Sequence, residues 1–258
     1  MRLLAIVFAV LSTGVARADD RAWDRPVPAP IAERSLASVL DDVRAAVRRG
    51  ERPVVVFDLD DTAIDGRARL EVAAQRAGLP SRGLTSARDV YIGLAGSALD
   101  AKRDAFGKHY FDDPALSELD TPQAGVRRFI REIVRAGGRP VYVSGRWEST
   151  RASTEAELKR LGIPLHNSRD LLLSPGPQMK ALAWKAAAHT EVMKRGTVVA
   201  AFDNEANAAL GYARAFPKAR TSRLATFRFG AAPAKKPRGV TVIRNFGATW
   251  RRASVGAR

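Results

Sequence analysis

The sequence predicts an α/β protein with a doubly wound parallel sheet and a small helical insertion. Short, β-branched apolar runs at residues 54–57, 140–143 and 197–202 are typical of strands that are buried on both faces. Stretches with helical periodicity separate these runs, as expected when crossover helices join parallel strands. All three runs end at polar residues, and such sheets bind ligands beyond the carboxyl ends of their strands. We therefore expect the functional site at that edge.

Length and composition limit the class of protein. The chain has 258 residues and a hydrophobic content of 46%, enough for one sizeable core with an insertion. It contains no cysteine, which excludes disulfides, thiolate nucleophiles and thiolate metal ligands. The formal net charge of +16 favours anionic partners through long-range attraction. The basic residues are scattered and accompany no nucleic-acid motif, so nucleic acid is not the favoured partner.

The start of the chain, residues 1–18, is predicted to be a secretory signal peptide. A positive residue, Arg2, precedes an apolar run at residues 3–11, and a small-x-small site ends at Ala18. The apolar run is shorter than the about 20 residues that span a bilayer, so no stable membrane insertion is expected. Cleavage after Ala18 would give an exported protein that is periplasmic or secreted.

Residues 19–65 are predicted to open the α/β core. A helix is expected over residues 31–49, where apolar side chains recur with helical spacing and Gly50 follows as a stop. The helix leads into the strand at residues 54–57, and Asp58 is the first residue after that strand. The most acidic stretch of the core therefore begins where its first strand ends.

Residues 66–120 interrupt the core. The segment is predicted to be helical over residues 67–78 and to form short helices within residues 85–109. No further buried strand is expected in it. We interpret it as a small helical cap over the site.

The core is expected to resume at residue 121 and to continue to residue 230. Thr121 and Pro122 are predicted to be the N-cap and first residue of a helix. The remaining predicted elements are helices over residues 149–161 and 179–194 and strands over residues 171–173, 223–229 and 240–243. Residues 231–258 are interpreted as a partly solvated basic segment that includes one edge strand.

The predicted strand ends bring carboxyl, hydroxyl and lysine side chains to one crevice. Asp58 and Asp60 would face the same space, because residues i and i+2 of an extended chain point to one side. A carboxylate can attack phosphorus to form an aspartyl-phosphate, and a second carboxyl can carry the proton. A hard divalent cation would lower the repulsion between carboxylate and phosphate, and Mg²⁺ suits an oxygen-only site. These residue types predict phosphoryl transfer.

The stretch Asp58-Leu-Asp60-Asp-Thr62 matches the pattern Asp-x-Asp-x-Thr. This is the first motif of the haloacid dehalogenase superfamily, and the chain resembles the exported acid phosphatases of that superfamily over about residues 53–229. The resemblance implies a Rossmann-like core with a cap. It also implies that Asp58 is the nucleophile and a Mg²⁺ ligand, and that Asp60 is the general acid/base whose backbone carbonyl binds the metal. Thr62 is implied as a phosphate-binding residue.

Two later segments resemble further motifs of the superfamily. Val-Tyr-Val-Ser-Gly-Arg resembles the second motif, which implies that Ser144 binds phosphate. Asp203 is implied as the acidic Mg²⁺ ligand of the last motif. The chain departs from that motif at Phe202 and Asn207, where a glycine and a second acidic residue are usual, and Glu205 is the candidate for the missing charge.

The phosphate-binding lysine is expected on the helix at residues 179–194. Lys180 and Lys185 lie on this helix but well apart around it. We expect Lys180, near the helix start, to be the phosphate lysine, with Lys185 as the alternative. Arg146 is interpreted as a surface or cap contact.

The sequence thus predicts an exported, magnesium-dependent phosphatase that hydrolyses small phosphomonoesters, such as nucleotides or sugar phosphates, through an aspartyl-phosphate. One alternative is a phosphatase of nucleic-acid ends, which only the positive charge favours. An alternative from another class is a catalytically silent polyanion-binding protein that keeps the fold. The three acidic positions Asp58, Asp60 and Asp203 argue against that second alternative.

Overall fold

The structure is a computed structural model. It describes residues 23, 25–79, 97–176, 178–226, 232–233 and 235–247. The predicted signal peptide lies outside the described residues, as do residues 80–96 of the predicted cap and residues 248–258 of the basic segment. Within the described ranges, no helix is both long and apolar enough to cross a membrane.

Six strands form one parallel sheet. They are β1 (Pro53–Phe57), β4 (Arg139–Trp147), β5 (Leu171–Ser174), β6 (Thr197–Asp203), β7 (Arg220–Leu224) and β8 (Val240–Ile243). Their order is β5-β4-β1-β6-β7-β8, and every neighbouring pair is parallel. The chain builds outward from β1 to β5 and then returns to β6 on the other side of β1. The crevice beyond β1 and β6 is therefore the topological switch point, where ligands bind in such sheets.

Helices cover both faces of this sheet, as predicted for a doubly wound fold. The helices are α2 (Ala29–Arg48), α7 (Val126–Arg135), α8 (Arg151–Arg160), α9 (Ala181–Met193) and α10 (Ala206–Ala215). Side chains of α2, α7 and α8 share one hydrophobic cluster with the sheet, and those of α9 and α10 share a second cluster with its opposite face. The predicted fold class is confirmed, although α10 was not predicted.

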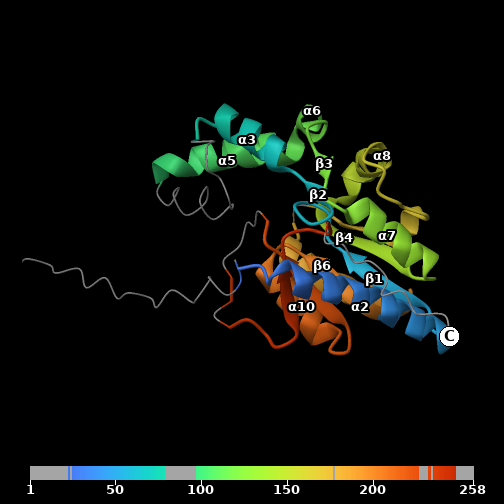
Figure 1. Cartoon of the computed structure of the whole chain (residues 1–258). Helices are drawn as coiled ribbons and strands as arrows, with labels where there is room; N and C mark the ends of the chain where they lie inside the picture. Colours follow the sequence, from blue (N-terminus) through green and yellow to red (C-terminus); the bar gives the residue numbers. More distant parts are fainter. Residues whose placement is uncertain are drawn as a thin grey trace, which may run out of the picture.

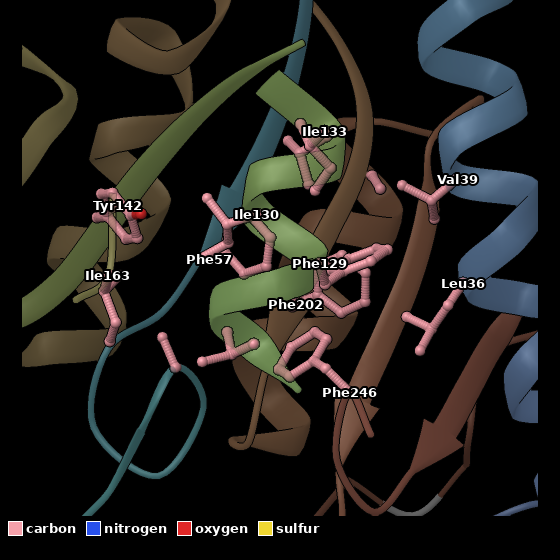
Figure 2. Close-up of a cluster of buried hydrophobic side chains, with 14 of the residues drawn as sticks. Leu36, Val39, Phe57, Phe129, Ile130, Ile133, Tyr142, Ile163, Phe202 and Phe246 are labelled. Carbon is pink, nitrogen blue, oxygen red and sulfur yellow. The ribbon is translucent and has the colours of Figure 1, made fainter. Parts of the chain in front are cut away.

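Four phenylalanine rings lie at the centre of the first cluster (Figure 2). Phe57 of β1 stacks on Phe202 of β6 with ring centroids 5.1 Å apart, and Phe129 stacks on Phe246 at 5.5 Å. Gly125, which precedes α7, has a positive φ of 81°, and a Cβ there would lie 2.2 Å from the Phe246 carbonyl oxygen. The absence of a side chain at Gly125 therefore lets the last described segment approach α7 and place its ring in the core.

A helical insert leaves the core after β1 and lies beyond the carboxyl edge of the sheet (Figure 1). Its helices are α3 (Arg67–Arg76), α5 (Ser97–Asp112) and α6 (Pro114–Ser117). They pack on a hydrophobic cluster of their own, which includes Leu70, Phe106 and Tyr110. This insert is part of the segment predicted to be a cap, and its role as a cap stays a prediction.

A two-stranded antiparallel ribbon closes the insert. It consists of β2 (Ile64–Asp65) and β3 (Thr121–Pro122). The predicted helix start at Thr121 and Pro122 is therefore wrong, since the helix begins at Val126. Pairing with β2 holds Thr121 and Pro122 in an extended conformation, and proline is tolerated on such an edge strand.

Candidate active site

The ends of two neighbouring strands carry the two buried carboxylates of the site. Asp58 follows β1, and its N–H donates to the carbonyl of Phe202 at 2.9 Å. Asp203 is the last residue of β6 and is fully buried. The Nζ atom of Lys185 lies 2.8 Å from Oδ1 of Asp58 and 2.8 Å from Oδ2 of Asp203. The sheet register and one lysine thus bring the two carboxylates together.

Burial has the largest effect on the pKa values of Asp58, Asp203 and Lys185, which we call the trio. It raises the pKa of Asp58 to about 7, against the lowering effect of Lys185 and with a further rise from Asp203. The pKa of Asp203 is also raised by burial, which Lys185 opposes. For Lys185, burial acts to lower the pKa, but the charges of Asp203 and Asp58 outweigh it and hold the pKa well above the usual value. Lys185 is therefore a fixed cation, and two ionised carboxylates would leave the trio with one negative charge.

The contacts correct the choice between the two lysines. Lys180 is the exposed residue just before α9, whereas Lys185 lies one turn further on and its side chain is buried against the sheet. Lys180 was preferred because the start of the helix was expected to lie nearer to the strand ends. Lys185, on the face of α9 that packs against the sheet, is the one that contacts Asp58. Lys185 is accordingly the candidate phosphate lysine.

Thr62 lies between two loops of the site. Its hydroxyl is 3.2 Å from Oδ2 of Asp58 and 3.3 Å from Oδ1 of Asn204, and the side chain is fully buried. Because a hydroxyl has one proton, it can donate to only one of these oxygens at a time. Thr62 therefore orients Asp58, and its predicted contact with phosphate stays a prediction.

Ser144 lies on β4, the strand beside β1, and is buried. Its Oγ accepts from the backbone N–H of Arg146 at 3.2 Å, and its carbonyl accepts from Nε1 of Trp184 at 2.9 Å. A Cβ on Gly145 would lie 2.8 Å from the Cβ of Ala181, so glycine allows α9 to start close to this strand end. Ser144 is thus held at the predicted edge, and phosphate binding by it stays a prediction.

The cations that contact Asp60 differ from the lysine that contacts Asp58. Arg146 donates to both its oxygens, from Nε at 2.9 Å and from Nη2 at 2.8 Å, and Nη2 of Arg69 donates at 2.6 Å. Burial acts to raise the pKa of Asp60, but the charges of Arg146 and Arg69 outweigh it and hold the pKa well below its usual range. The interpretation of Arg146 as a surface contact is wrong, because it binds carboxylates of the core.

Sequence reasoning also missed Arg69, which reaches Asp60 from helix α3 of the insert. Its side chain is only 5% exposed, packs over the ring of Tyr110 and lies 3.1 Å from Oδ1 of Asp120. The sequence contains one indication that Arg69 is buried. It precedes Ala73 by four residues, so both lie on the same, buried face of α3. An arginine at such a position needs a buried anion, and two carboxylates supply it.

The comparisons with known proteins agree with this geometry. A family model described as HAD superfamily, subfamily IIIB (acid phosphatase), matches residues 100–212, a stretch that contains Ser144, Lys185 and Asp203. The solved structure of a candidate phosphatase from Clostridium difficile has the same fold, with a TM-score of 0.51 and 10% identity over 75% of this chain and 94% of that chain. Over the matched residues the chain is similar to acid phosphatases of the haloacid dehalogenase superfamily. This match supports a phosphomonoesterase.

Two other solved structures resemble the chain. Protein Tyrosine Kinase A from Mycobacterium tuberculosis has a TM-score of 0.51 at 14% identity, over 75% of this chain and 94% of that chain. The class C acid phosphatase from Bacillus anthracis has a TM-score of 0.42 at 20% identity, over 68% of this chain and 64% of that chain. At these identities a structural likeness establishes the fold alone. No curated protein matches the sequence.

Haloacid dehalogenase phosphatases generally use Mg²⁺, and the donors present fit this ion. In the described part of the chain, no group of three or more histidine or acidic side chains is arranged as a metal cluster. Mg²⁺, however, is usually held by one or two carboxylates together with waters and substrate phosphate. Asp58 and Asp203 are two such carboxylates, with one surplus negative charge beside Lys185. Their charge and oxygen donors suit a hard cation.

The candidates for a further metal ligand lie at the start of α10. Glu205 is the N-cap residue, and its N–H donates to Oδ1 of Asp203 at 2.8 Å. Glu205 and Asn207 are both half-buried. Metal binding by either side chain stays a prediction.

Proposed function

We propose that the protein is a magnesium-dependent phosphomonoesterase that works through an aspartyl-phosphate at Asp58. One observation carries the proposal: a buried carboxylate stands at the carboxyl end of the central strand, at the switch point, in contact with a lysine. An unreactive carboxylate in that position would be costly, because burial disfavours its charged form.

The proposed reaction has two displacements. An oxygen of Asp58 attacks phosphorus and forms a P–O bond, while the bond from phosphorus to the ester oxygen breaks and the leaving oxygen takes a proton from Asp60. Water then attacks the phosphoryl group, its proton passes to Asp60, and the bond from phosphorus to Asp58 breaks. Asp60 then passes that proton to the phosphate, which leaves as the monoanion, so both carboxyls end ionised as they began.

The proton of the first step has to arrive with the substrate. Arg146 and Arg69 favour the ionised form of Asp60, so the free enzyme stores no proton there. A phosphomonoester monoanion carries one, since its second pKa is about 6. Asp60 would pass that proton from the phosphoryl group to the leaving oxygen.

Asp58, Asp203 and the backbone carbonyl of Asp60 are the groups that would hold Mg²⁺. The ion would neutralise charge on the phosphoryl oxygens and lower their repulsion with the attacking carboxylate. Lys185 would contribute a second positive charge on the same side, and Ser144 and Thr62 hydroxyls would donate to phosphoryl oxygens.

Small phosphomonoesters are the favoured substrates. The helical insert stands beyond the carboxyl edge of the sheet, where it would limit the size of a leaving group near Asp58 (Figure 1). The net charge of +16 would attract any anionic ester, so it does not select among nucleotides, sugar phosphates and phosphorylated oligonucleotide ends.

Phosphate release from p-nitrophenyl phosphate, with and without Mg²⁺, tests the proposal. Asp58→Asn should abolish turnover, and Asp41→Asn, the same change at an exposed position on α2, should leave it unchanged. Full activity of the Asp58→Asn variant would contradict the nucleophile assignment. A native protein that is inactive with every divalent cation would favour the polyanion-binding alternative.

A thermal melt tests the metal separately from activity. Mg²⁺ should raise the unfolding temperature of the native protein, because a ligand that binds only the folded state stabilises it. Asp203→Asn should remove that rise, whereas Asp41→Asn should keep it. A rise that persists in Asp203→Asn would place the ion elsewhere.

We also propose that residues 1–18 direct export and are cleaved after Ala18. The short apolar run and the small-x-small site support this. Expression in a bacterium, followed by fractionation and mass measurement of the mature protein, would test it. A cytoplasmic product that retains Met1 and residues 2–18 would contradict the proposal.

A further inference from the structure

A network of five ionisable side chains joins the helical insert to the core. Asp60 binds Arg69 and Arg146, Arg69 also contacts Asp120, and Arg146 also binds Glu157. None of these side chains is more than 17% exposed. The insert supplies Arg69 and Asp120, so the network is formed while the insert is docked on the core.

The hydrogen bonds to Asp60 are not shared evenly between its two oxygens. Oδ1 accepts from Nη2 of Arg69 and from Nη2 of Arg146, whereas within the described part of the chain Oδ2 accepts from Nε of Arg146 alone. A carboxylate offers about four acceptor positions, two on each oxygen. The described donors therefore fill Oδ1 and leave one position on Oδ2.

We propose that Arg69 is a positioning residue for the proton transfer by Asp60. By occupying the second acceptor position of Oδ1, it leaves Oδ2 as the atom that takes the proton and delivers it to the leaving oxygen. This inference rests on the proposed function, since it assumes that Asp60 carries the proton. It adds that an arginine of the insert selects the reacting oxygen.

The dependence of the rate on the leaving group distinguishes this role from a structural one. An alkoxide leaving group needs a proton, whereas p-nitrophenolate leaves readily without one. Loss of proton transfer should therefore lower kcat/KM for glycerol 2-phosphate far more than for p-nitrophenyl phosphate. A damaged fold or weaker phosphate binding would lower both values equally.

The experiment compares Arg69→Gln and Asp60→Asn with the native protein on both substrates. Asp60→Asn should lower kcat/KM for glycerol 2-phosphate by at least about 100-fold. Arg69→Gln should lower it by about tenfold and change the p-nitrophenyl phosphate value by much less, because one charge-assisted hydrogen bond is lost. Arg76→Gln is the matched control, since it removes an exposed ion pair of the same helix that does not involve Asp60.

Arg69→Lys keeps the test valid if Arg69→Gln does not fold. Lysine retains the buried charge but cannot reproduce the fork that contacts two carboxylates, so a smaller loss in the same direction is expected. Equal losses on both substrates, no loss, or a gain on glycerol 2-phosphate would overturn the inference. If Asp60→Asn itself lacked the leaving-group dependence, the role of Asp60 in the proposed function would fail instead.

Discussion

The amine of Lys185 lies 2.8 Å from a carboxylate oxygen of Asp58, and both side chains are buried. The same amine lies 2.8 Å from Asp203, so one cation from α9 serves carboxylates of two neighbouring strands. Coulomb attraction between such groups is strong because the surroundings hold little water, and so is the penalty for leaving any of them unpaired. This relationship leads us to expect that both stability and activity depend on Lys185.

Replacement of Lys185 by methionine should therefore destabilise the protein as well as inactivate it. Asp58 and Asp203 would face each other without a cation, at a cost of about 3–5 kcal/mol in the free energy of unfolding. Chemical denaturation would measure this cost, and phosphate release would measure activity. Lys180→Met, at the exposed start of α9, should change neither quantity by much. The reverse ranking of the two variants would restore Lys180 as the phosphate lysine.

Thr62→Val should reduce activity more than stability. The hydroxyl holds an oxygen of Asp58, and its loss should cost about 1 kcal/mol of stability and lower kcat/KM by about tenfold. Thr62→Ser keeps the hydroxyl and should stay close to the native protein. If valine and serine behave alike in the activity assay, the orienting role of this hydrogen bond is wrong.

Asp120→Asn should change how stability depends on pH. Burial raises the pKa of Asp120 to about 8, and the hydrogen bond with Glu157 adds to the rise, against the effect of Arg69. As the pH rises above about 4, the unfolded chain releases this proton while the folded protein retains it, so native stability falls by up to about 1.4 kcal/mol per pH unit until about pH 8. Asparagine has no such proton.

The unfolding temperature of Asp120→Asn, relative to the native protein, should therefore increase between pH 5 and pH 8. The rise should stop near pH 8, where the folded protein also loses the proton. Thermal melts at each pH measure the difference directly. A difference that is constant over this range would mean that the pKa of Asp120 is not raised in the folded protein.

Phe202→Ala should cost about 3–5 kcal/mol of stability. Phe202 stands where the superfamily usually has glycine, and its ring stacks on Phe57 and meets Phe129 edge-on at 5.6 Å. Phe111→Ala, at a ring that is 53% exposed on the insert, is the matched control and should change stability by less than about 0.5 kcal/mol. Similar losses for both variants, by chemical denaturation, would contradict the packing role of Phe202.

The main elements of the core were predictable because their signals are local. Residues 54–57 and 240–243 read as strands and lie within β1 and β8, since short β-branched runs have few alternatives in a buried sheet. The helix start predicted at Thr121 and Pro122 was wrong because threonine and proline occur both at helix N-termini and on edge strands. Which of the two forms depends on the pairing with Ile64 and Asp65, and that partner lies more than fifty residues earlier in the chain.

The site was predictable in its residue types and less so in its pairings. Asp58 follows β1, Asp203 ends β6 and Ser144 lies near the end of β4, and parallel strands bring their carboxyl ends to one edge. The choice between Lys180 and Lys185 depends on which face of α9 meets the sheet. The structure places Lys185 against Asp58, and phosphate binding by either lysine stays a prediction. Arg69 was missed and Arg146 was interpreted differently, because the folding of the insert and of β4 onto the strand ends decides which carboxylates each arginine meets.

The sequence by itself determined the doubly wound fold, the position of Asp58 at the end of the first strand and the phosphatase chemistry that such a carboxylate favours. Only the tertiary structure decided which cation each carboxylate receives: Lys185 for Asp58 and Asp203, and Arg69 with Arg146 for Asp60. Strand ends follow from local patterns, but the partner of a buried charge depends on the packing of helices against the sheet. That packing also gives Asp58 and Asp60 opposite pKa shifts, although they are two residues apart.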